Sequence, residues 1–105
     1  MIKLYHRQGS RSERVIWLME ELHIKYELET VERGVGSNRD FREMNPLGRV
    51  PVMLDGDSPV FDSGAMLEYL LERFDKDNSF SPARGSKEWR EYVQWMYGAE
   101  TFLAP

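Results

Sequence analysis

Apolar residues recur at two different spacings near the start of the chain. Residues 2–5 are apolar at positions 2, 4 and 5, as in a short strand, and a polar loop containing glycine follows. From residue 12 to residue 23 apolar side chains recur every three or four positions, which predicts an amphipathic helix that Ser10 or Ser12 could cap. In residues 26–30, Tyr26, Leu28 and Thr30 alternate with glutamates, which predicts a second strand. A strand, a helix and a strand with short links form a βαβ unit, so we expect parallel strands.

A second pair of strands follows a loop. Residues 31–38 carry two glycines and predict a loop, and residues 41–44 indicate a brief helical turn. Residues 50–54 and 59–61 predict two short strands that we expect to be antiparallel. Between them, Asp55-Gly56-Asp57 is a hairpin turn signal.

The rest of the chain is predicted to be helical, with one polar interruption. Asp62-Ser63 is typical of a helix start, and the helix after it has an apolar face formed by Met66, Leu67, Leu70, Leu71 and Phe74. Residues 75–87 are polar, contain Pro82 and Gly85, and predict a linker. Residues 88–102 predict another helix, rich in aromatic side chains over much of its circumference. Such a helix requires burial on several sides, so we expect it to begin a second domain that is truncated here.

Composition narrows the class of protein. The chain has 105 residues, 41% of them hydrophobic, and a net charge of −4, which suits one small soluble domain and argues against general nucleic-acid binding. We find neither a membrane-spanning stretch nor a secretory signal, and therefore predict a cytoplasmic protein. The absence of cysteine excludes a cysteine nucleophile and a thiolate metal site. The two histidines, His6 and His23, are interpreted as ordinary polar residues, and no metal is expected.

Three segments contain residues that could carry chemistry. Pro51 stands where a strand should begin, and a cis bond before it would leave the Val50 backbone free to pair with an extended peptide. The helix start at Asp62-Ser63 could hold a carboxylate on its free N–H groups and an ammonium on the Asp62 side chain. These two groups together form the head group of an amino acid.

The third segment carries hydroxyl groups. Ser10 and Ser12 lie between the first strand and the first helix, and Tyr5 ends that strand. Any of these hydroxyls could donate a hydrogen bond to a ligand thiolate and lower the pKa of the thiol. The alternative is that the serines only cap the helix and that Tyr5 only packs in the sheet.

Together the three segments resemble the N-terminal domain of cytosolic glutathione S-transferases. The likeness covers residues 1–75: the segments 10–22, 45–51 and 62–70 look like the family's first loop and helix, its cis-proline segment and its glutamyl-binding helix. The resemblance implies an α/β fold, a thioredoxin-like βαβ-ββα domain followed by a truncated all-α segment. The expected division is a glutathione-binding domain over residues 1–76, a linker over 77–87, and the first helix of a helical domain over 88–105.

The resemblance also implies residue roles, with glutathione as co-substrate and no metal. Val50 would pair with the cysteinyl part, Pro51 would be cis, Asp62 and Ser63 would bind the γ-glutamyl group, and Arg49 would lie near the ligand. For the activating hydroxyl, Ser10 matches the serine-type classes of bacterial and fungal relatives and ranks first, before Tyr5 and then Ser12. The sequence departs from the insect-type pattern at Gly48, where that pattern has a ligand-binding histidine, which puts the glycyl-end contacts in doubt.

By the same resemblance we expect the protein to be a glutathione transferase that acts in detoxification. The thiolate of bound glutathione would attack a small hydrophobic electrophile, and the protein would be a cytoplasmic homodimer without nucleic-acid or membrane partners. Two alternatives stay open: a non-catalytic interaction module of the same fold, and a glutathione-dependent isomerase, dehalogenase or peroxidase. The sequence leaves undecided whether this chain is active without the rest of the helical domain.

Overall fold

The protein is described by a computed structural model that places residues 1–103. It divides into two compact units, Met1–Leu67 and Glu68–Pro105, and the division falls inside one helix. The last two residues of the expected segment 88–105 lie outside the described residues.

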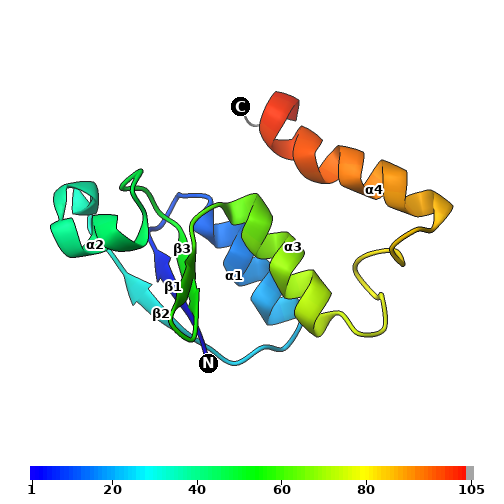
Figure 1. The fold of residues 1–105 in the computed structure, drawn as a ribbon, viewed down its shortest axis with the longest axis horizontal. Helices are drawn as coiled ribbons and strands as arrows, with labels where there is room; N and C mark the ends of the chain where they lie inside the picture. Colours follow the sequence, from blue (N-terminus) through cyan, green and yellow to red (C-terminus); the bar gives the residue numbers. More distant parts are fainter. Residues whose placement is uncertain (104–105) are drawn as a thin grey trace. The chain divides into compact units, whose positions relative to one another are not determined.

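The first unit is built on a mixed sheet with the strand order β2-β1-β3-β4 (Figure 1). The strands are β1 Ile2–His6, β2 Tyr26–Thr30, β3 Val52–Asp55 and β4 Ser58–Val60. β1 is parallel to β2 and antiparallel to β3, and β4 is antiparallel to β3. The predicted α/β class, the parallel pair and the hairpin are therefore confirmed.

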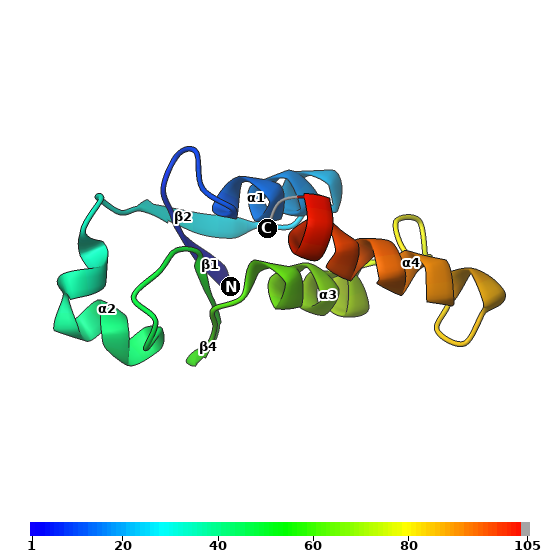
Figure 2. The same cartoon turned by 90° about the horizontal axis from the view of Figure 1, so that it is seen from above.

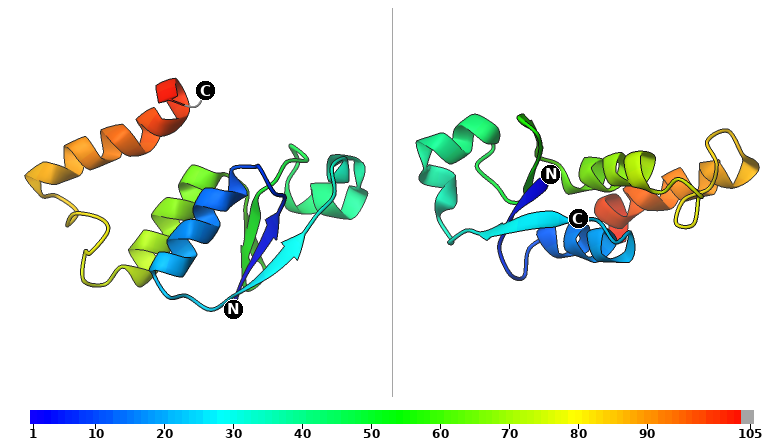
Figure 3. Two further views of the ribbon diagram at one scale, coloured as in Figure 1. Left: turned by 180° about the vertical axis from the view of Figure 1, so that it is seen from behind. Right: turned by 90° about the horizontal axis from the view of Figure 1, so that it is seen from below.

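Helices cover both faces of this sheet. α1 Ser12–Glu21 and the first turn of α3 Ser63–Phe74 lie on one side of the strands (Figures 1 and 2). The short helix η1 Val35–Ser37 and α2 Arg39–Met44 lie on the other side, as the view from behind also shows (Figure 3). The brief helical turn predicted near Phe41 is thus a distinct helix, capped by the Asn38 side chain, which accepts from the Phe41 N–H at 2.9 Å.

The core of the first unit lies between the sheet and α1. Ile2 and Leu4 of the central strand β1 are almost completely buried, as are Val15 and Met19 on the inner face of α1. Because side chains alternate along a strand, the neighbours of Leu4 in β1 point to the opposite face. Burying such apolar side chains contributes about 1.5–3 kcal/mol each, so this contact is one of the main contributions to the unit's stability.

Two strand boundaries differ from the sequence prediction. β3 begins at Val52 and not at Val50, since Pro51 has no N–H to donate to a ladder. β4 begins one residue earlier than expected because Ser58 pairs with Asp55 across a two-residue turn, in which Gly56 has φ +70°.

The second unit contains α4 Lys87–Gly98, which continues as the π-helical turn η2 Ala99–Leu103. Trp95 and Phe102 meet edge to face at 5.8 Å between ring centroids. Gly98 permits this contact, because a Cβ atom there would lie 2.6 Å from the Phe102 ring.

The segment predicted as a linker is organised around one buried carboxylate. Asp75 accepts hydrogen bonds from the backbone N–H groups of Ser79, Phe80 and Ser81 and from the Ser81 hydroxyl, at 2.7–3.0 Å. Burial raises the pKa of Asp75, but the four hydrogen bonds together outweigh it and leave the pKa below its ordinary value. The polar residues of this segment therefore form an ordered turn at the end of α3.

We expect Asp75→Asn to destabilise the second unit by about 1–2 kcal/mol at pH 7, because an amide nitrogen cannot accept these bonds. The folded pKa is lowered, so the stabilisation is present above the unfolded pKa and is lost as the pH falls through the folded value. The difference between the two proteins should therefore shrink below about pH 4. This difference in the free energy of unfolding is measured by urea denaturation, monitored by the fluorescence of Trp89 and Trp95 in a Trp17→Phe background. Asp77→Asn, at an exposed position, is the matched control, and an equal effect of both substitutions would contradict this role.

Candidate functional site

Most of the sequence-predicted site residues lie on segments that meet at one edge of the sheet in the first unit. β1 and β4 end at this edge, and β3, which runs antiparallel to both, begins there. The loop after β1 carries Ser10, the segment before β3 carries Val50 and Pro51, and the chain after β4 enters α3 at Ser63. The fold therefore brings three segments that are far apart in the sequence to the same edge.

Ser10 is held by a short hydrogen-bonded loop between β1 and α1. Its hydroxyl donates to the Arg7 carbonyl at 2.6 Å, contacts the Ser12 hydroxyl at 2.6 Å, and accepts from the Ser12 N–H at 3.2 Å. The last bond satisfies a free donor at the start of α1. The N-cap residue is Arg11, without a side-chain capping bond, so the prediction that Ser10 or Ser12 is the cap was wrong. Gly9, at φ +78°, donates its N–H to the Glu13 carboxylate at 2.7 Å and completes the turn.

Ser12 lies behind Ser10 and is completely buried. Its hydroxyl lies 2.6 Å from Nδ1 of His6 and 3.3 Å from the Arg7 carbonyl oxygen. A ligand at the surface would therefore meet the half-buried Ser10 and not Ser12.

The start of α3 combines a capped helix end with a cation. Asp62 accepts from the Ala65 N–H at 3.0 Å, so Asp62 provides the capping side chain. Ser63 is 5% exposed, and its hydroxyl accepts from Nη2 of Arg14 at 2.6 Å and from Nε at 3.2 Å. Because the Ser63 oxygen accepts from a guanidinium, its own hydrogen stays available for an anion. The helix dipole and the Arg14 charge both favour a carboxylate here.

A buried amide shapes the segment before β3. Asn45 is fully buried, and its side chain donates to the Arg49 carbonyl at 2.7 Å and accepts from the Leu47 N–H at 2.9 Å. The Val50–Pro51 peptide bond is cis, as the resemblance implied. Asn45 thus fixes the path of the chain that leads to Val50.

Gly48 explains the departure from the insect-type pattern. It has φ +65°, and a Cβ atom there would lie 3.0 Å from the Gly36 carbonyl oxygen and 2.5 Å from the Arg42 guanidinium. Arg42 donates to the carbonyls of Gly36 and Pro46 at 2.8 and 2.9 Å, which fixes this close backbone crossing. A histidine at position 48 would not fit this backbone.

Tyr5 lies on the other face of the sheet from Leu4 and His6. Its ring meets Phe41 of α2 edge to face at 6.0 Å, and the Lys3 ammonium lies 5.1 Å from its ring centroid. Tyr5 also lines a hollow of about 380 Å³ together with residues of β2 and α2. The hydrogen bond from Lys3 to Glu29, with Tyr5 adding to it, raises the pKa of Lys3. The structure therefore separates Tyr5 from the hydroxyl cluster of Ser10.

Sequence reasoning missed three residues of this site: His6, Arg14 and Asn45. His6 was interpreted as an ordinary polar residue, but its imidazole contacts Ser12. The sequence signal for Arg14 was its position one helical turn after Ser10 on the polar face of α1. Its contact with Ser63 spans a long stretch of chain, which no local pattern shows.

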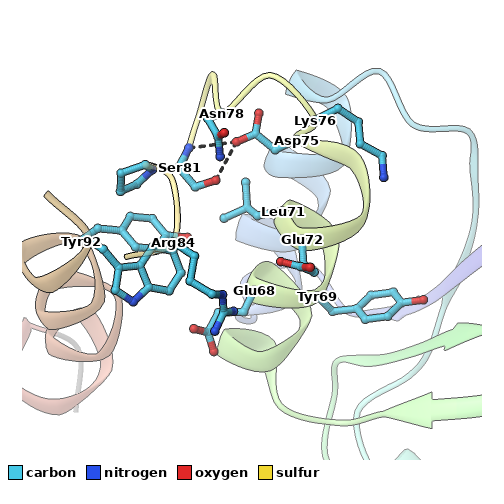
Figure 4. A pocket seen from close by; sticks show the side chains of 12 residues that line it. Glu68, Tyr69, Leu71, Glu72, Asp75, Lys76, Asn78, Ser81, Arg84 and Tyr92 are labelled. Carbon is cyan, nitrogen blue, oxygen red and sulfur yellow. Dashed lines mark hydrogen bonds between the residues drawn. The ribbon is translucent and has the colours of Figure 1, made fainter. Parts of the chain in front are cut away.

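A second hollow, of about 450 Å³, lies within the second unit (Figure 4). It is lined by α3, by the turn around Asp75 and by the start of α4. Arg84 lies over the Trp89 ring at 5.0 Å and points toward Glu68 in Figure 4. Burial, followed by the charges of Glu68 and Asp75, raises the pKa of Tyr92, which also lines it. None of the site residues expected from the sequence lies here.

Within residues 1–103, no group of three or more His, Asp or Glu side chains is placed to hold a metal ion. Over the same residues, the structure contains no helix of the length and apolar character that crossing a membrane requires.

Comparison with known proteins identifies the family. The family profile "Glutathione S-transferase, N-terminal domain" matches residues 4–79. Glutathione S-transferase 3 of Schizosaccharomyces pombe is 34% identical over 100% of this chain, which spans 43% of that protein. The chain therefore belongs to the glutathione S-transferase family, and it spans less than half the length of this curated relative.

Solved structures confirm the thioredoxin-like glutathione S-transferase fold. A glutathione S-transferase from Actinobacillus pleuropneumoniae has a TM-score of 0.83 and 34% identity, covering 96% of this chain and 48% of its own. The glutathione transferase URE2P6 from Phanerochaete chrysosporium has a TM-score of 0.85 and 31% identity, covering 92% of this chain and 47% of its own. The second of these structures is a complex with oxidised glutathione.

Proposed function

We propose that this chain binds glutathione along the sheet edge described above and that Ser10 activates the glutathione thiol. One observation carries the proposal. A half-buried hydroxyl, Ser10, and a cation-supported helix start, Ser63 with Arg14, occupy the same edge within one unit. An extended peptide along this edge has an anion site for one end and a hydroxyl donor for its thiol.

The γ-glutamyl end would bind at the start of α3. Its carboxylate would accept from the Ser63 hydroxyl and the free N–H groups of the helix, with the Arg14 charge beside it. Its ammonium would be held by Asp62, which is exposed and has one carboxylate oxygen engaged in the cap. The two charges of an amino-acid head group would thus each meet the opposite charge.

The cysteinyl part would lie beside the segment that Asn45 shapes. The Val50 backbone lies just outside the β3 ladder, where it would pair with the ligand backbone as an added strand would. Arg49 is exposed next to it and would lie near the ligand. The thiol would then face the loop of Ser10.

The chemistry at the thiol is nucleophilic substitution. A hydroxyl hydrogen bond stabilises the thiolate more than the thiol and thereby lowers the pKa of the thiol. The thiol proton passes to water. The thiolate sulfur then attacks an electrophilic carbon of a small hydrophobic second substrate, forming the S–C bond while the leaving group on that carbon departs with its bonding electrons. Lowering this pKa by about two corresponds to about 2.7 kcal/mol of differential stabilisation.

The larger organisation is proposed from the family. The glutathione-binding domain would span residues 1–76, with a linker over 77–87 and a helical domain beginning at 88. The family profile, which ends at residue 79, supports this division. On the basis of the same family membership, the complete protein would be a cytoplasmic homodimer acting in detoxification, with the electrophile bound mainly by a helical domain.

Calorimetric titration with glutathione tests the proposal. We expect binding, and we expect Ser63→Ala to weaken it about tenfold because one hydrogen bond to a charged carboxylate is lost. Ser58→Ala, an exposed serine in β4, is the matched control and should leave the affinity unchanged. Absence of binding, in this chain and in a longer chain that includes the helical domain, would reject the proposal in favour of a non-catalytic module.

A further inference from the structure

Three short contacts link His6 to the loop that carries Ser10. Nδ1 of His6 lies 2.6 Å from the Ser12 hydroxyl, and that hydroxyl lies 2.6 Å from the Ser10 hydroxyl. The Ser10 hydroxyl in turn lies 2.6 Å from the Arg7 carbonyl oxygen. Each distance is that of a strong hydrogen bond, so each contact must contain one hydrogen.

Counting hydrogens shows where they come from. Each serine hydroxyl has one hydrogen, and the Arg7 carbonyl has none, so the serines supply two hydrogens for three contacts. The third hydrogen must come from His6, which means that Nδ1 carries it. Ser12 is fully buried, so its oxygen does not contact bulk water, and no water molecule from the solvent takes the place of His6 as the donor to it.

The direction of every bond follows. His6 donates to Ser12, Ser12 donates to Ser10, and Ser10 donates to the Arg7 carbonyl. In the reverse arrangement, with Nδ1 as acceptor, Ser12 would donate to His6 and Ser10 would have to donate to Ser12. Ser10 would then have no hydrogen left for the Arg7 carbonyl or for a ligand.

We propose that His6 is a positioning residue that acts through Ser12 to keep the Ser10 hydrogen available for the ligand sulfur. This inference rests on the proposed function, in which Ser10 activates the thiol. When glutathione binds, the Ser10 hydrogen turns from the Arg7 carbonyl to the sulfur, while Ser10 still accepts from Ser12. Consecutive hydrogen bonds polarise one another, so a donor behind Ser10 makes Ser10 a stronger donor.

The first test needs no ligand. Nitrogen-15 NMR of the imidazole should show a protonated Nδ1 on His6 in the free protein. His23, which is exposed and does not belong to the chain of contacts, is the internal reference. A His6 Nδ1 without a hydrogen would overturn the proposal, whether or not glutathione binds.

The second test compares two substitutions at position 6 whose side chains, asparagine and aspartate, have nearly the same shape as each other. In His6→Asn the amide nitrogen can take the place of Nδ1 and donate, whereas the carboxylate of His6→Asp can only accept. The measured quantity is the pKa of the thiol of bound glutathione, which is obtained from the absorbance of the thiolate as a function of pH. We expect the asparagine variant to resemble the wild type, and the aspartate variant to lower the acid dissociation constant of the bound thiol by about tenfold.

A double-mutant cycle separates this route from direct charge repulsion. In a Ser12→Ala background the link between position 6 and Ser10 is broken, so most of the difference between the asparagine and aspartate variants should disappear. The same tenfold difference in both backgrounds would mean that the aspartate charge acts directly, and would overturn the proposal. If glutathione does not bind at all, the proposed function fails, while the NMR measurement still tests the hydrogen-bond direction.

Discussion

Replacing Ser10 by alanine is expected to lower the acid dissociation constant of the bound glutathione thiol by about a hundredfold. The physical reason is that the alanine variant has no hydroxyl to stabilise the thiolate, while the site for the γ-glutamyl group at Ser63 is unchanged. Glutathione affinity should therefore fall much less than the thiolate signal. Thiolate absorbance of the complex against pH, together with calorimetry of the same variant, measures both quantities.

Tyr5→Phe is the matched control for this prediction. It removes a phenolic hydroxyl and keeps the ring that packs edge to face on Phe41. If Ser10 is the activating group, this variant should keep the thiolate signal of the wild type. A signal that survives Ser10→Ala and is lost in Tyr5→Phe would assign the activation to the tyrosine.

Replacing Asn45 by alanine is expected to destabilise the first unit by about 3 kcal/mol. Asn45 is fully buried, and its side chain satisfies both the Arg49 carbonyl and the Leu47 N–H. Removing it leaves two backbone groups unpaired and a cavity beside them. Because these bonds also fix the chain that leads to Val50, glutathione affinity should fall as well. Urea denaturation followed by circular dichroism gives the free energy of unfolding.

Two further variants make this prediction specific. Leu47→Ala changes a side chain that is 62% exposed in the same segment and should alter stability by less than about 0.5 kcal/mol. Asn45→Asp keeps an acceptor for the Leu47 N–H but places a second carboxylate oxygen against the Arg49 carbonyl, so it should be at least as destabilising as alanine. A stable Asn45→Asp variant would show that the bond to Arg49 is unimportant.

Much of the fold could be predicted because its signals are local. The spacing of apolar residues from position 12 to position 23 identified α1, and alternation at residues 26–30 identified β2. The two-residue turn at Gly56 identified the β3–β4 hairpin. The boundary of β3 was wrong by two residues, since a strand begins where its ladder partners begin, and the partner of Val52 is Tyr5 of a distant strand.

The candidate site was only partly predictable. Ser10, Pro51 and Ser63 stand in recognisable segments, each a turn or a helix start with a preferred residue type. Their mutual arrangement was beyond local reasoning. Arg14 reaches Ser63 only because α1 and the start of α3 share one face of the sheet.

The sequence by itself determined the α/β class, the order of the elements, the absence of a cysteine nucleophile and the resemblance to glutathione S-transferases. The class and the order follow from periodicity and turn chemistry, which act over a few residues, and the absence of a cysteine nucleophile follows from composition, whereas the resemblance rests on the segments 10–22, 45–51 and 62–70. Only the tertiary structure decided that Tyr5 packs against Phe41 of α2, and that His6 lies behind Ser12. It also decided that Asp75 organises an ordered turn. Hydrogen-bond partners of this kind are chosen by proximity in space, which the chain acquires only when its strands and helices pack together.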